Sequence, residues 1–147
     1  MHSRSMGGGR RLALIGAIVL IVGCLLPGYT VGGGLGELPI AIDGPSVLPQ
    51  ALTYPQGMIA MLAGLATLAL IVLPYATGPR PLAVDRGIVF GILATAALVS
   101  LVLWVFAVLP APEGLLPMGA YGFWISAVGA IIMGRAAFEI AQEPPRR

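Results

Sequence analysis

The chain has 147 residues, of which 58% are hydrophobic and 10% are charged, with a mean hydropathy of +0.96. A water-soluble domain of this size does not show that balance, so the composition excludes one and predicts a membrane protein. The formal charge of +2 does not indicate a nucleic-acid partner. A nucleic-acid interface needs clustered basic residues together with residues that read the bases.

Four long apolar segments follow one another along the chain, and no Asp, Glu, Lys, Arg or His lies near the middle of any of them. A helix needs roughly 20 mostly apolar residues to cross a bilayer. The sequence therefore predicts an all-α fold, a four-helix transmembrane bundle, formed by a single integral membrane domain. We expect this domain to cover residues 1–147, with spans at about 12–31, 58–75, 87–109 and 119–137.

The arginines predict which side of the membrane each connection faces. Outside the spans they occur in segments 1–11, 76–86 and 138–147, whereas segments 32–57 and 110–118 contain none. By the positive-inside rule the first three segments are cytoplasmic and the other two face outward, so both termini are cytoplasmic. All eight basic residues are arginine, which together with abundant Ala, Gly and Pro is typical of a GC-rich bacterial genome. We therefore expect a bacterial cytoplasmic membrane.

Aromatic residues gather near the predicted outer ends of the spans, among them Tyr29, Tyr54, Trp104, Tyr121 and Trp124. Amphipathic rings are enriched at headgroup depth, so these positions predict an interfacial belt. The outer connection between the first two spans is dense in Gly and Pro, which excludes a long helix there. This connection is expected to be irregular or to contain short strands, such as one over 38–42.

Small residues recur at helical spacing in three of the spans, where they let another helix backbone approach closely. They predict packing between the second, third and fourth helices, and the same faces could alternatively contact a partner subunit. The candidate packing residues are Ala60, Gly64, Gly87, Gly91, Gly122, Ser126, Ala130 and Gly134.

The single cysteine, Cys24, allows two interpretations. Residues 21–24 fit the lipobox of a bacterial lipoprotein, and Arg10 and Arg11 precede a signal-like apolar stretch. Cleavage there would leave a lipidated Cys24 at the start of a chain with three spans. However, the apolar run continues beyond the cysteine until it reaches spanning length, which favours Cys24 as a packing residue within the first span.

Chemically active residues are sparse in the sequence. His2 is the only histidine, and Ser100 and Ser126 have no recognisable base nearby in sequence. The outer carboxylates do not follow the alternating pattern of a calcium loop. We therefore expect no catalytic residue, no metal site, no bound cofactor and no enzymatic activity. A coupled transporter would normally carry an ionisable group within a span, which this sequence lacks.

Two short motifs carry a resemblance to a known group of proteins. The first span ends in Pro-Gly-Tyr-Thr-Val at 27–31, and the fourth begins with Gly-Phe-Trp at 122–124. With the basic N-terminal tail and the basic, Pro-rich inner loop, the chain resembles small four-span integral membrane proteins of actinobacteria. The resemblance covers most of the chain and implies an architecture but no activity or site residues. Claudin-type tetraspans are similar in architecture only, since their paired outer-loop cysteines and tryptophan are missing here.

Together these observations predict a non-catalytic multi-pass membrane protein that acts as an accessory or scaffold subunit of a membrane complex. Its expected partners are the lipid bilayer and either another membrane protein or a second copy of itself. The alternative is an oligomeric passive pore or a small-solute transporter, because the same hydropathy pattern would serve that function.

Overall fold

The computed structural model describes residues 7–26, 30–31, 42–43, 55–76, 86–108 and 121–142. These residues form the helices α1 (Gly8–Leu25), α3 (Pro55–Ala76), α4 (Arg86–Val108) and α5 (Tyr121–Gln142), with the short strands β1 (Thr30–Val31) and β2 (Ile42–Asp43). Each helix is long and apolar enough to cross a membrane. The prediction of four apolar spanning helices is therefore confirmed.

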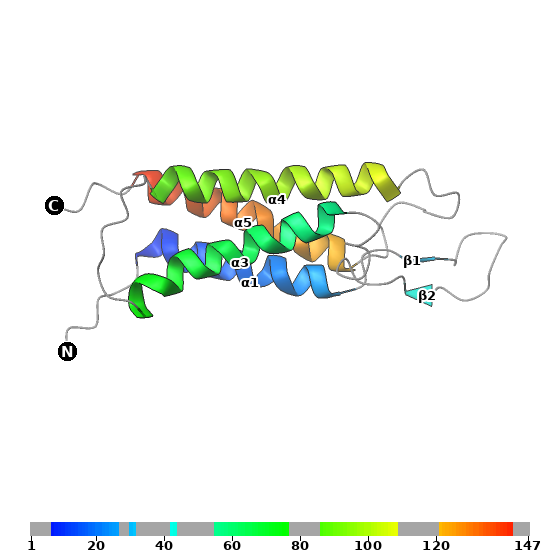
Figure 1. The fold of residues 1–147 in the computed structure, drawn as a ribbon, viewed down its shortest axis with the longest axis horizontal. Coiled ribbons are helices and arrows are strands. Elements are labelled where there is room, and N and C mark those ends of the chain that lie inside the picture. The colour runs from blue at the N-terminus through cyan, green and yellow to red at the C-terminus, as the bar shows by residue number, and fades with distance from the viewer. Residues whose placement is uncertain are drawn as a thin grey trace.

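The four helices form a ring in which each one packs against two neighbours (Figure 1). The adjacent pairs are α1 with α3, α3 with α4, α4 with α5, and α5 with α1. Successive helices run in opposite directions, so every adjacent pair is antiparallel. As a result, α1 and α4 begin where α3 and α5 end, and β1 and β2 lie beyond the opposite end of the bundle.

Helix α1 ends at Leu25, six residues before the predicted boundary at 31. Leu26 has an extended backbone, with φ −85° and ψ 162°, and its N–H bonds to the carbonyls of Gly23 and Val22. The residue before a proline is restricted to such a conformation, and position 27 is proline. The proline therefore explains why the helix stops inside the apolar run.

The two strands pair in antiparallel register, Thr30 with Asp43 and Val31 with Ile42. The strand that we expected over 38–42 overlaps β2 at position 42. Positions 38–41 lie outside the described residues. Helices α1 and α5 also extend beyond the predicted spans, because α1 begins at Gly8 and α5 continues to Gln142.

The core is made mainly of small side chains, while large apolar side chains lie on the outside. Alanine is the commonest residue among the buried hydrophobic positions, and Trp104 is the largest side chain that is fully buried. Small core residues let the helices approach closely, and large apolar surfaces are stable when lipid surrounds them. The most exposed large side chains include Ile88, Ile92, Phe106, Tyr121, Ile131 and Phe138.

Candidate functional site

The closest helix contact in the bundle joins α1 and α5 along three glycines of α1, Gly9, Gly16 and Gly23, which are spaced seven residues apart. A Cβ atom built on Gly16 would lie 2.8 Å from the backbone nitrogen of Met133. A Cβ on Gly9 would lie 2.9 Å from Cγ1 of Ile140. Seven residues make about two helical turns, so all three glycines share one face of α1.

The same contact is equally close when it is viewed from α5. A Cβ on Gly129 of α5 would lie 2.7 Å from Cα of Leu20 on α1. Near the end of α1, a Cβ on Gly23 would lie 2.9 Å from the carbonyl oxygen of Gly122 on α5. Real Cβ atoms do not approach other atoms so closely, so the two backbones touch where only glycine fits. We call this contact, formed by Gly9, Gly16, Gly23, Gly122 and Gly129, the α1–α5 seam.

The structure places the six candidate packing residues of α4 and α5 in different surroundings. Gly122, Ser126 and Ala130 are buried on the face of α5 that carries the seam. Gly87 packs on α5, since its Cβ would lie 3.0 Å from Cα of Ala141. By contrast, a Cβ on Gly91 or Gly134 would meet no heavy atom within 4 Å, so neither glycine is a point of close approach.

Three glycines of the seam, Gly9, Gly16 and Gly23, were not among the packing residues predicted from the sequence. The glycines of α1 recur at a spacing of seven residues, and this repeat is visible in the sequence. The packing faces that we predicted follow small residues at a spacing of four. The pairing of α1 with α5 was likewise not predicted, because hydropathy does not identify which helices are neighbours.

Cys24 and Ser126 meet within the α1–α5 seam, and the side chains of both are fully buried. Ser126 Oγ lies 3.7 Å from Cys24 Sγ and donates a weak hydrogen bond to it. Within the described residues, no group of three or more His, Cys, Asp or Glu side chains could hold a metal ion. The surroundings of Cys24 are those of a small packing residue.

A polar cluster lies between α3 and α4 toward the end of the bundle that faces the strands. Ser100 Oγ on α4 donates a hydrogen bond to the backbone carbonyl of Gln56 on α3. Trp104 follows one turn later on α4 and is only 1% exposed. Its Nε1 and the Oε1 of Gln56 are both buried, and neither has a hydrogen-bond partner in the part of the chain that the structure describes.

Trp104 does not lie in the position that we expected for an interfacial anchor. Its ring is inside the bundle and stacks on Phe123 of α5, with 5.8 Å between ring centroids and 18° between ring planes. Tyr121 and Trp124, by contrast, are exposed on the outside of the same end. Hydropathy gives the depth of a residue along a helix but not the direction in which it faces, which explains the difference for Trp104.

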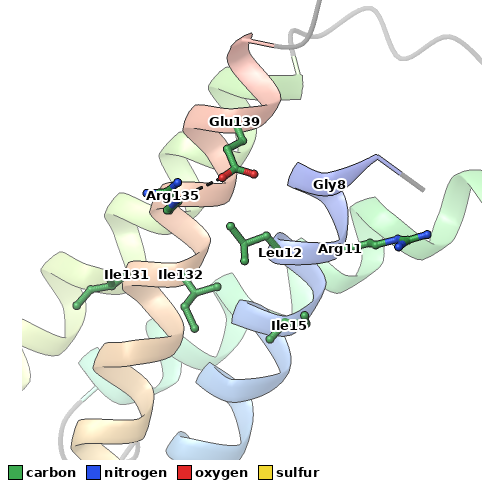
Figure 2. A pocket seen from close by; sticks show the side chains of 8 residues that line it. All are labelled: Gly8, Arg11, Leu12, Ile15, Ile131, Ile132, Arg135 and Glu139. Atoms are coloured by element: carbon green, nitrogen blue, oxygen red, sulfur yellow. Dashed lines mark hydrogen bonds and ion pairs between the residues drawn. The ribbon is translucent and has the colours of Figure 1, made fainter. Parts of the chain in front are cut away.

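A groove of about 390 Å³ lies between α1 and α5 at the end of the bundle where α1 begins (Figure 2). We call it the α1–α5 groove. Its apolar walls are formed by Leu12 and Ile15 of α1 and by Ile131 and Ile132 of α5.

The charged residues of the groove lie above these walls. Arg135 donates a hydrogen bond from Nε to Oε1 of Glu139 at 3.2 Å, one helical turn further along α5. Arg11 also lines the groove, although its side chain extends away from α5 (Figure 2). The groove therefore combines apolar walls with two arginines and one carboxylate.

Comparisons with known proteins do not add a relative or a fold neighbour. No family model matches the chain, and no curated protein or solved structure matches it.

Proposed function

We propose that the chain is a non-catalytic multi-pass protein of a bacterial cytoplasmic membrane and acts as an accessory or scaffold subunit of a membrane complex. The α1–α5 seam is the observation that supports this proposal. At Gly16 and Gly23 a Cβ atom would clash with backbone atoms of α5, so the two helices are in direct backbone contact there. A closely packed bundle of this kind suits a framework that holds other segments in place. The bacterial assignment rests on the all-arginine basic set and on the resemblance to small actinobacterial four-span proteins.

The distribution of arginines supports an orientation with both termini in the cytoplasm. Arg10 and Arg11 lie in the first turn of α1, Arg86 begins α4, and Arg135 lies in the last third of α5. These are all the arginines among the described residues, and all belong to the same end of the bundle (Figure 1). By the positive-inside rule that end faces the cytoplasm, and the connection between α1 and α3 faces outward.

We assign the contact with the partner to this outer connection. It links Leu25 to Pro55 and is longer than the connections usual within compact domains, which indicates a function of its own. Its sequence includes the apolar residues Leu38, Ile40 and Val47, which could enter a partner's surface. Pairing of β1 with β2 brings 30–31 beside 42–43.

Deletion of residues 34–50 tests this assignment. We expect the shortened chain to insert into the membrane normally, because the deletion leaves all four helices intact. After gentle detergent extraction, the partner membrane protein should co-purify at a constant ratio with the full chain. It should no longer co-purify with the shortened chain. A control that lacks only residues 144–147 should still recover that protein. Equal recovery by both shortened chains would contradict the assignment.

A further inference from the structure

The α1–α5 groove places aliphatic side chains directly below exposed charged groups. The walls of the groove are aliphatic. Two of the wall residues, Ile15 and Ile131, are 52% and 60% exposed on the outside of the bundle. In a membrane these two side chains contact lipid acyl chains. Leu12 and Ile132 point toward each other from the two helices and form the floor (Figure 2).

Arg135 stands above this floor with most of its hydrogen-bonding capacity available. Its side chain is 75% exposed, and Nε is the atom that bonds to Glu139. A guanidinium group has five N–H donors, so its two terminal nitrogens can still bind an anion in a bidentate manner.

The position of Arg135 along the bundle suits the phosphate of a lipid. It lies seven residues before the end of α5, or about 10 Å along the helix axis. In the seam it falls between the levels of Gly9 and Gly16. An arginine at that depth extends its charged group toward the headgroups, where the phosphates of the lipids lie.

The first turn of α1 adds positive charge at the same place. Gly8 lines the groove, Gly7 provides no side-chain cap, and the first turn contains no acidic residue. The backbone N–H groups in the first turn of a helix favour an anion. Arg11 also contributes to the local field. Arg135 and the helix start therefore give the groove positive charge that complements a negatively charged headgroup, although the Arg11 side chain extends away from α5 (Figure 2).

We propose that the α1–α5 groove binds an anionic phospholipid of the surrounding bilayer. The terminal nitrogens of Arg135 hold the phosphate, and one acyl chain lies along Leu12, Ile15 and Ile132. Glu139 competes with the phosphate for the same guanidinium group, so it weakens the binding. Basic sites beside aliphatic helix surfaces are the usual form of headgroup recognition in membrane proteins.

The proposal is tested by native mass spectrometry of the full chain, released from nanodiscs that contain equal amounts of phosphatidylglycerol and phosphatidylcholine. The unmodified protein should retain phosphatidylglycerol in preference to phosphatidylcholine. Arg135→Gln should lower that preference about tenfold, the loss expected when a charge-assisted hydrogen bond to the phosphate is removed. Glu139→Gln should raise it, since the competing carboxylate is lost. Arg86→Gln is the matched control, because it removes the same charge from the same end of the bundle but on α4, and it should leave the preference unchanged.

Three results would overturn the proposal. The first is equal retention of the two lipids by the unmodified protein. The second is a loss after Arg86→Gln as large as that after Arg135→Gln, which would indicate general attraction to the membrane surface. The third is displacement of phosphatidylglycerol by millimolar inorganic phosphate, which would indicate a simple anion site. A lower preference after Glu139→Gln would likewise contradict the competing role of that carboxylate.

Discussion

Gly16 of α1 lies so close to Met133 of α5 that a Cβ atom on the glycine would stand 2.8 Å from the methionine's backbone nitrogen. The neighbouring atom belongs to a backbone and not to a flexible side chain, so it cannot move aside cheaply. The same relationship recurs at Gly23, two turns further along α1, whereas at Gly9 the nearest atom is Cγ1 of the Ile140 side chain. The packing of α1 on α5 therefore depends on the absence of a side chain at these positions.

Gly16→Ala is predicted to destabilise the bundle. Insertion of one methyl group into a tightly packed contact costs about 1–3 kcal/mol, because the helices must separate to admit it. The measurement is the free energy of unfolding in mixed micelles as the fraction of a denaturing detergent increases. Gly16→Leu should prevent recovery of a folded monomer.

Gly134→Ala is the matched control, since it makes the same change on α5 at a position with open space. Alanine is favoured over glycine within a helix by about 0.5–1 kcal/mol, so this variant should be as stable as the original protein or slightly more stable. If Gly16→Ala and Gly134→Ala lost equal stability, the seam would not be the site of closest packing.

Much of the fold could be predicted from the sequence, because the four apolar segments are long and free of charge. The limits of the helices were less predictable. The apolar run around Leu25 and Leu26 continues beyond the end of α1, and Pro27 determines where the helix stops. Likewise α5 continues past the predicted boundary, where Ile140 is buried and packs beside Gly9 of α1.

Trp104 provides a second prediction, concerning its unpartnered indole. Trp104→Phe keeps an aromatic ring beside Phe123 and removes a buried N–H that has no acceptor among the described residues. We expect its unfolding free energy to change by less than about 1 kcal/mol. Trp104→Ala should cost about 3–5 kcal/mol, because it leaves a cavity in the core. A large loss with phenylalanine would show that the indole N–H has a partner.

Cys24 is predicted to be unmodified and inaccessible in the folded protein. Its side chain has no exposed surface and contacts Ser126 within the seam. The intact mass should correspond to a chain without a lipid on Cys24, and a maleimide should react with it only after denaturation. A mass that matches a lipidated chain beginning at Cys24 would establish the lipoprotein interpretation instead.

The orientation is predicted from the arginines and can be measured separately. With Cys24→Ala as the background, Ser46→Cys should react with a membrane-impermeant maleimide added to intact cells. Ser3→Cys should react only after the cells are opened, because the basic N-terminal tail is cytoplasmic. Labelling of Ser3→Cys in intact cells would reverse the proposed topology.

The candidate sites were harder to predict from the sequence than the helices. The glycines at 9, 16 and 23 are visible as a repeat of seven, but the sequence alone does not show that the opposing glycines lie on α5. The α1–α5 groove depends on the same pairing, since Leu12 and Ile132 are far apart along the chain and meet only when α1 packs on α5. Contacts between distant segments are set by three-dimensional packing, which periodicity does not reveal.

The most direct test of the proposed function is the composition of the particle that contains the chain at its native level of expression. The tagged protein would be extracted with a mild detergent, separated by size and identified by mass spectrometry. We predict one different membrane protein at a fixed ratio to this chain, as expected for an accessory or scaffold subunit. Recovery of the chain only as a homo-oligomer would contradict that function and would favour a pore formed between copies.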